Sequence, residues 1–235
     1  MKRTRRLLAL LLSLTLVMGL LPAAALAAED TVTRKDFTPV SEIDPEVLAA
    51  ELKNLGLFQG NGELPDGSTD FDLNRAPTRI EAVIMLIRVL GQEQAARSGS
   101  WNHSFRDVPA WADAYIGYAY EKRLSSGISD TEFGTTDASA AMYLTFVLRA
   151  LGYSDAEGDF LWSEPYALAT QAGILPLSVN LETFWRSDLV RVSAAALGAK
   201  LKGSEQTLAE KLIGEGVFTE AQYEAAELIH SIFAD

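Results

Sequence analysis

Apolar residues recur at helical spacing along residues 71–91, FDLNRAPTRIEAVIMLIRVLG, and cover the second half of this stretch almost all the way round. A helix with so wide an apolar surface is typical of the interior of a bundle. Thr78 and Glu81 match a capping box, in which the threonine oxygen accepts from the third helical N–H and the glutamate accepts from the N–H of the cap. The pattern therefore predicts a buried helix that begins near Arg79.

The succession of helix, turn and apolar helix occurs three times, at a period of roughly 50–60 residues. The copies span residues 44–91, 105–152 and, in a more degenerate form, 160–201. No copy can cover its most apolar helix alone, so the economical arrangement places the three second helices side by side with the first helices outside. The sequence predicts an all-α fold of three helix-turn-helix pseudo-repeats around a central three-helix bundle. A C-terminal tail, residues 204–235, is expected to add two short helices.

Cap and turn residues predict where the other helices begin and end. Asp44 is the expected cap of a first helix that has Pro45 at its first position. Residues 59–70 are expected to form a loop and residues 92–104 a connector, because both are rich in glycine or polar residues. The remaining helices are expected at about residues 111–124, in the stretch ending at residue 152, and at about residues 163–173 and 189–201.

The first 27 residues have the pattern of a secretory signal peptide. Basic residues at the start are followed by an apolar run over residues 7–21 and by the small-x-small site ALA at residues 25–27. An uncleaved membrane anchor is the alternative, but the run is short for a membrane span. We therefore expect a secreted protein, with an extended lead-in over residues 28–43.

The 235-residue chain has 20 Lys and Arg against 32 Asp and Glu, a formal charge of −12. The expected signal peptide holds four of the basic residues and none of the acidic ones, so its removal changes the charge to −16. A nucleic-acid partner is not expected, because phosphate binding needs a basic face. The absence of cysteine excludes disulfides, a thiol nucleophile and thiolate metal ligands. The remaining chain is long enough to bury a core without disulfides.

Arg79 is an unusual residue for the first turn of a helix. A cation there faces the positive end of the helix dipole. One explanation is a solvated side chain, or an ion pair with Glu81 or another nearby carboxylate. The other is that Arg79 and the free N–H groups of this turn together receive an anion, with the guanidinium as a two-pronged donor.

Several short motifs occur in a fixed order: TRIEA at residues 78–82, FRDV at 105–108, WA at 111–112, YI at 115–116 and RALG at 149–152. In this combination they resemble repeats of the S-layer homology family. The resemblance covers about residues 44–201.

The resemblance implies a pseudo-threefold bundle whose grooves between neighbouring repeats hold a cell-wall polysaccharide. In the family, the ligand is often a sugar with a pyruvate ketal, whose carboxylate meets the signature arginine, here Arg79. The function implied is non-covalent attachment to the bacterial cell wall, and the location implied is the cell wall or cell surface (S-layer). The other residues that we expect to bind the glycan, or to fix the turn that carries Arg79, are Arg191, Asp107, Trp111, Glu81 and Thr78.

The chain departs from the family pattern in two copies. Residues 139–142, SAAM, keep a cap but have no arginine, and residues 190–193, VRVS, keep Arg191 but lack the threonine and glutamate. Asp188 is a possible replacement cap for the third copy. We therefore expect one or two complete grooves and at least one silent groove. The alternative function is an extracellular scaffold whose degenerate grooves bind another surface protein.

Calcium binding and catalysis are the other functions considered. Asp70, Asp72, Asn74 and Glu81 match ligand positions of a calcium loop, but Arg75 stands where that loop needs glycine. The two histidines, at positions 103 and 230, are far apart, and the acidic residues lie in turns and caps. We expect a monomer that is not an enzyme, with no catalytic residue, metal or cofactor and no membrane contact after signal cleavage.

Overall fold

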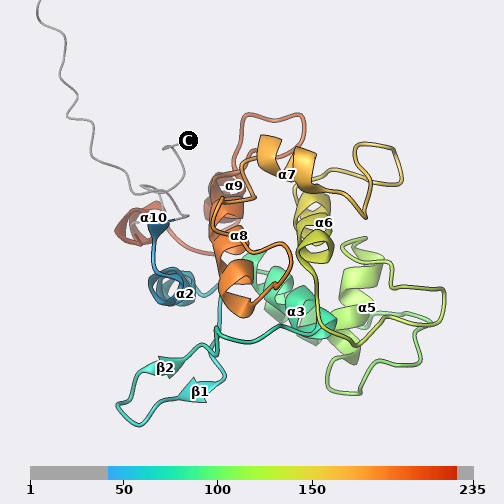
Figure 1. Ribbon diagram of the computed structural model, residues 1–235, viewed down its shortest axis with the longest axis horizontal. Helices are drawn as coiled ribbons and strands as arrows, with labels where there is room; N and C mark the ends of the chain where they lie inside the picture. The colour runs from blue at the N-terminus through green and yellow to red at the C-terminus, as the bar shows by residue number, and fades with distance from the viewer. Residues whose placement is uncertain (1–41, 227–235) are drawn as a thin grey trace, which may run out of the picture. The chain divides into compact units, whose positions relative to one another are not determined.

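The computed structural model describes residues 42–226. The expected signal peptide, the lead-in as far as residue 41, and residues 227–235 of the tail lie outside the described residues. The elements, in chain order, are α2 (Pro45–Asn54), β1 (Gly62–Glu63), β2 (Thr69–Asp70), α3 (Arg79–Val89), α4 (Glu93–Ser98), α5 (Asp113–Glu121), α6 (Ala140–Ala150), α7 (Tyr166–Gln171), α8 (Arg186–Gly198), α9 (Leu208–Gly214) and α10 (Glu220–Ala225) (Figure 1). The predicted all-α class is confirmed, because the regular structure between residues 42 and 226 is helical apart from one two-stranded hairpin.

Helices α3, α6 and α8 pack against one another, and each also contacts at least one helix from outside this centre (Figure 1). Helix α5 packs on α3, α7 on α6, and α2 on α8. In each case the first helix of one predicted repeat lies against the second helix of the repeat before it. The contact of α2 with α8 closes this cycle. We interpret the three helix pairs as the predicted pseudo-repeats.

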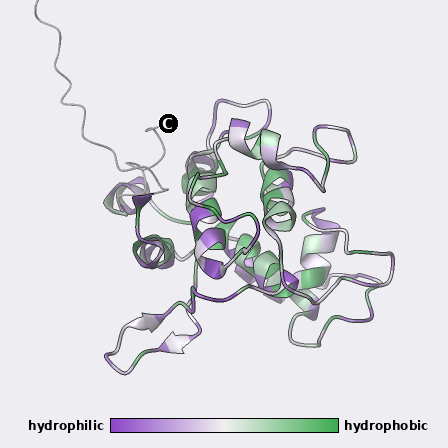
Figure 2. Ribbon diagram, in the orientation of Figure 1, coloured by the Kyte–Doolittle hydropathy of each residue, from purple (hydrophilic) through white to green (hydrophobic). Residues whose placement is uncertain are grey.

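The central helices bury most of their side chains. Helix α6 is drawn largely in the hydrophobic colour in Figure 2, and seven of its residues are buried. Residues 194–196 of α8 are three buried alanines, whose small side chains allow helix backbones to approach closely. A 2.7 Å hydrogen bond between the hydroxyls of Tyr143 and Ser193 joins α6 to α8 and satisfies both groups in the core. Between residues 42 and 226 no helix has the length and apolar character needed to cross a bilayer.

The predicted helix starts at Pro45 and Arg79 are confirmed. The Asp44 carboxylate accepts from the N–H of Glu46 at 2.9 Å, and Pro45 takes the first helical position of α2. At α3 the capping box is complete: Thr78 Oγ1 accepts from Glu81 N at 3.2 Å, and Glu81 Oε2 accepts from Thr78 N at 2.7 Å. Local sequence therefore determines both of these boundaries.

Two segments expected to be irregular contain regular structure. Residues 59–70 include the hairpin β1–β2, whose turn is closed by a hydrogen bond from Leu64 N–H to the carbonyl of Ser68. Residues 92–104 include α4, whose Glu93 forms a 2.9 Å ion pair with Arg88 at the end of α3. These elements are too short to produce a periodic pattern in the sequence. The composition of both segments therefore indicated only a loop and a connector.

Helix α8 begins three residues earlier than predicted, at Arg186. Asp188 is the third helical residue, not the cap: its carboxylate accepts from Trp185 N at 2.9 Å and from Asn180 N at 3.1 Å. Trp185 holds the cap position although its side chain has no acceptor for the helix N–H groups. Arg186, rather than Arg191, therefore occupies the first helical position, which in α3 belongs to Arg79.

Candidate functional site

Arg79 extends from the start of α3 into the turn between α5 and α6. Its Nη2 donates to Ser125 Oγ at 3.2 Å and to the carbonyl of Gly127 at 3.3 Å. The guanidinium also lies 5.0 Å from the ring centre of Phe133 and 5.1 Å from that of Phe146. Only 7% of the residue is exposed, so Arg79 is neither solvated nor a surface ion pair.

The positive charge of Arg79 is not balanced by a carboxylate contact from the described residues. The acceptors of its two side-chain hydrogen bonds are neutral, and its buried Nε has no hydrogen-bond partner in this part of the chain. Burial lowers the pKa of Arg79 to about 10, with the charge of Arg149 acting in the same direction and that of Asp107 against it. Arg79 is still charged at neutral pH. An anion would therefore be a favourable partner for this desolvated cation.

A cavity of about 530 Å³ lies beside Arg79. Its walls come from the turn before α6, the exposed side of α6 itself and the loop before α7, and include Ser126, Ser139, Met142, Thr145, Phe146 and Trp162. The Trp162 residue is 67% exposed. A cation, several hydroxyls and an aromatic side chain around one cavity suit a polar ligand with an acidic group and an apolar face, such as an acidic sugar.

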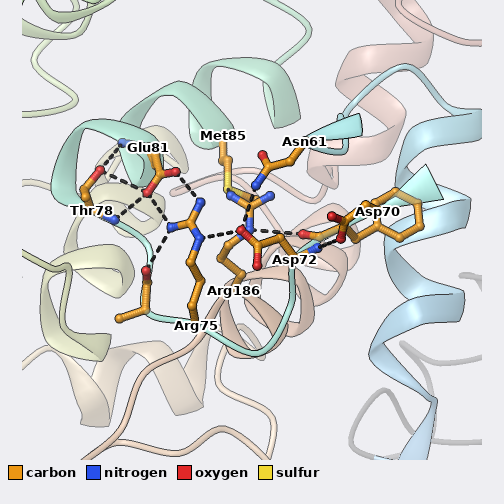
Figure 3. Close-up of polar contacts among 10 residues, drawn as sticks. Asn61, Asp70, Asp72, Arg75, Thr78, Glu81, Met85 and Arg186 are labelled. Atoms are coloured by element: carbon orange, nitrogen blue, oxygen red, sulfur yellow. Dashed lines mark hydrogen bonds and ion pairs between the residues drawn. The ribbon is translucent and has the colours of Figure 1, made fainter. Parts of the chain in front are cut away.

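Glu81 and Thr78 do not line this cavity, and they fix the turn that presents Arg79. Figure 3 shows the Arg75 guanidinium against the Glu81 carboxylate, with Nη1–Oε2 and Nη2–Oε1 distances of 2.9 and 2.6 Å. Burial opposes ionisation of Glu81, but the bonds from Arg75 and Thr78 outweigh it and lower the pKa of Glu81 to about 2. The ion pair that was an alternative for Arg79 is therefore made by Arg75.

Three of the calcium-loop residues, Asp70, Asp72 and Glu81, make hydrogen bonds in the same network. Asp72 Oδ2 accepts from Asn61 Nδ2 at 2.7 Å and pairs with Arg75 (Figure 3). Within residues 42–226 no group of three or more acidic or histidine side chains is arranged to hold a metal ion.

Asp107 and Trp111 lie outside the cavity. The Asp107 carboxylate accepts from the backbone N–H groups of Phe133 and Gly134, each at 2.8 Å. Burial opposes ionisation of Asp107, but these two bonds outweigh it and lower its pKa. Asp107 therefore holds the turn whose Phe133 ring faces Arg79. Trp111, just before α5, is 64% exposed and does not line the cavity.

Arg191 does not reach the cavity either. It is the sixth residue of α8, and its Nη1 donates to the carbonyl of Ile43 at 2.8 Å, at the start of the described chain. Its distance from the helix start follows from the earlier beginning of α8. A second anion contact by Arg191 therefore stays a prediction.

Arg186 is the counterpart of Arg79 that the sequence analysis missed. It is 3% exposed; its Nε donates to the carbonyl of Phe71 at 3.1 Å, and its Nη1 lies 3.7 Å from Met85 Sδ (Figure 3). Its backbone N–H donates to Arg75 O at 2.9 Å, three residues before the cap of α3. Arg79 N–H likewise donates at 2.9 Å to Thr136 O, three residues before the cap of α6. The start of α8 is therefore joined to the segment before α3 in the same way as the start of α3 is joined to the segment before α6. We call each of these contacts a junction.

No protein-family model matches the sequence. The chain is 28% identical over 235 residues to a cell surface protein of Thermoanaerobacter kivui, covering 95% of this chain and 29% of that protein. It is 30% identical over 132 residues to a surface layer protein of Brevibacillus choshinensis, covering 55% of this chain and 11% of that protein. It is 25% identical over 162 residues to a middle cell wall protein of Brevibacillus brevis, covering 68% of this chain and 14% of that protein. The chain thus spans less than a third of the length of each of these relatives.

These similarities confirm the predicted location at the cell surface and support a role associated with the cell wall. The relatives are named as surface and wall proteins and not as enzymes, which fits a non-catalytic role.

Proposed function

We propose that the chain attaches non-covalently to the cell wall by binding an anionic wall polysaccharide in the cavity beside Arg79. Arg79 would receive a carboxylate of pyruvate-ketal type, and Trp162 would lie against a sugar ring. Thr78, Glu81 and Asp107 would position these groups without touching the ligand. We further propose that residues 44–91, 105–152 and 160–201 are diverged repeats of S-layer homology type, with one glycan-binding groove complete.

The observation that carries this proposal is that no carboxylate of residues 42–226 contacts the buried guanidinium of Arg79. A buried cation is costly unless a partner satisfies it, and the hydrogen bonds to Ser125 and Gly127 come from neutral acceptors. An anionic ligand in the adjoining cavity would supply the missing charge and an acceptor for the guanidinium. Because Arg79 is almost fully buried, this local attraction is screened less than the repulsion between the acidic surface and the polymer.

Co-sedimentation with purified cell-wall sacculi tests the proposal. Residues 28–235 should sediment with intact sacculi and remain in solution once the accessory polysaccharide has been stripped from them. Failure to bind intact sacculi would contradict the proposal and favour the alternative scaffold role.

Two matched pairs of variants test the site itself. Arg79→Met should weaken binding by about 10- to 100-fold through loss of a desolvated charge-assisted contact. Arg186→Met removes the equivalent buried arginine at a junction away from the cavity and should leave binding intact, provided that circular dichroism shows a folded chain. Trp162→Ala should weaken binding several-fold, whereas Trp111→Ala, at a tryptophan of similar exposure, should not. Equal losses within both pairs would show that the cavity is not the binding site.

A further inference from the structure

A second cavity, of about 810 Å³, adjoins the one beside Arg79. The two share Ser126, Arg149 and Asp155 as lining residues, so they form neighbouring parts of one surface groove. The second cavity lies between the end of α5 and the loop that follows α6. Its remaining walls include Tyr120, Arg123 and Tyr153.

Arg123 has a backbone conformation that is unusual for an arginine. It directly follows α5 and its cap residue Lys122, with φ of 59°, in the left-handed region. The residues in the same place after α2 and α7 are Gly56 and Gly173, with φ of 76° and 71°. In all three, the N–H closes the helix end by donating to a carbonyl three residues earlier. Glycine adopts this conformation without strain, so the arginine is not explained by the fold.

An equivalent cavity in the first repeat provides an internal comparison. It measures about 720 Å³ and is lined by Gly56, Arg88, Glu93 and Arg97. The Arg88–Glu93 ion pair, at 2.9 Å, corresponds to the Arg149–Asp155 pair, at 2.7 Å. Gly56 stands where the second repeat has Arg123. The guanidinium of Arg123 is therefore an addition to a cavity that the fold forms without it.

The charges around the second cavity leave Arg123 available. Asp155 is held by Arg149, Glu157 pairs with Lys202 at 3.9 Å, and Glu121 accepts a hydrogen bond from the backbone of residue 102 at 2.7 Å. Among residues 42–226, no hydrogen bond or ion pair joins the exposed Arg123 side chain to another residue. Its charge is thus free to meet a ligand.

We infer that this second cavity is a further subsite, in which Arg123 receives a second negatively charged substituent of the same polysaccharide. This inference rests on the proposed function, because it assigns the next acidic group along the bound polymer. A polymer with two acidic groups would reach Arg79 in one cavity and Arg123 in the other. The substituent is a carboxylate or a phosphate, since a guanidinium pairs with both.

Replacement of Arg123 by the glycine of the equivalent positions tests the inference. Arg123→Gly relieves backbone strain and should raise the unfolding midpoint by about 2–4 °C. It should nevertheless weaken binding to the purified wall polysaccharide by about three- to tenfold, as expected for loss of a partly exposed charge contact. Weaker binding by a more stable protein cannot be attributed to misfolding.

Arg97→Ala is the control, because it removes one positive charge from the equivalent cavity of the first repeat. It should leave affinity unchanged. Wild-type binding together with unchanged affinity of Arg123→Gly would overturn the second subsite while leaving the role of Arg79 standing. An equal loss in both variants would also overturn it, because only the overall charge would then matter. Absence of wild-type binding would instead contradict the proposed function itself.

Removal of phosphate groups from the polysaccharide separates the two possible substituents and leaves the carboxylate proposed for Arg79 in place. If Arg123 meets a phosphate, wild type and Arg123→Gly should bind the dephosphorylated polymer equally. If it meets a carboxylate, the difference between them should persist.

Discussion

Arg79 and Arg186 occupy the same helical position, yet Arg79 lines the 530 Å³ cavity and Arg186 does not. The difference lies in the residue beside each guanidinium, two positions after the left-handed residue that follows α2 (Gly56) or α5 (Arg123). Beside Arg186 the residue at this position is Phe58, whose ring centre lies 5.7 Å from the guanidinium. Beside Arg79 the residue at this position is Ser125, which occupies far less volume and accepts a hydrogen bond. A large ring therefore fills one junction, whereas a small hydroxyl leaves the other open to a ligand.

The Arg75–Glu81 contact predicts a pH-dependent contribution to stability. The pKa of Glu81 lies below its usual value, so its contribution is complete above about pH 5 and is lost as pH falls towards 2. Glu81→Gln should lower the free energy of unfolding by about 1–2 kcal/mol at pH 7. By pH 3 the gap between wild type and variant should shrink by about half. Urea unfolding at several pH values measures this gap.

Glu210 offers a matched control for Glu81. It completes the capping box of α9 with Thr207, at 2.7 Å, but has no ion pair with another residue between 42 and 226. Glu210→Gln should cause a smaller loss at pH 7, because no ion pair is removed with the charge. A Glu81→Gln effect of constant size between pH 7 and pH 3 would show that capping geometry, and not charge, accounts for the contact.

Helix boundaries were predictable where a cap acts through its own side chain. Thr78, Ser139 and Asp44 each accept from a helix N–H, and α2, α3 and α6 begin directly after them. At α8 the cap is Trp185, which cannot do this, so local patterns gave no indication of the start at Arg186. Here the third helical residue, Asp188, and the contact with residue 75 of another repeat determine the register.

The candidate site was only partly predictable for the same reason. Arg79 stood out because a cation in the first turn of a helix is unusual. Its surroundings depend on contacts across 46 and 48 residues, to Ser125 and Gly127, which no local pattern encodes. Trp162 is a similar case, because its position in the cavity wall depends on packing between two repeats.

The register of α8 leads to a test of its N-terminus. Asp188→Ala would leave the N–H groups of Trp185 and Asn180 without their acceptor, and should cost about 1–2 kcal/mol. For a chain of this size the unfolding midpoint should fall by about 2–8 °C in thermal melts. Asp137→Ala, at an exposed acidic residue near the start of α6, should change the midpoint by less than about 1 °C. Similar small shifts in both variants would contradict the capping role of Asp188.

At the scale of the whole molecule, closure of the cycle should make unfolding cooperative. Helix α2 packs on α8, and Arg186 donates to Phe71 across 115 residues, so the first and third predicted repeats hold one another in place. A single repeat would expose the faces that its neighbours cover. The cavity beside Arg79 is lined by residues from all three predicted repeats, so unfolding of any one of them should remove part of its wall.

The overall acidity of the chain predicts an unusual salt dependence of wall binding. With a formal charge of −16 after removal of the first 27 residues, the surface should repel an anionic polymer at long range. The Debye length shortens from about 30 Å at 10 mM salt to about 8 Å at 150 mM, so added salt should suppress this repulsion more than the contact inside the cavity. We expect the association rate with immobilised wall polysaccharide to rise about two- to fivefold over this range, with little change in the dissociation rate. Biolayer interferometry measures both rates; a steep loss of affinity would show instead that exposed basic residues attract the polymer, as they do in nucleic-acid binding proteins.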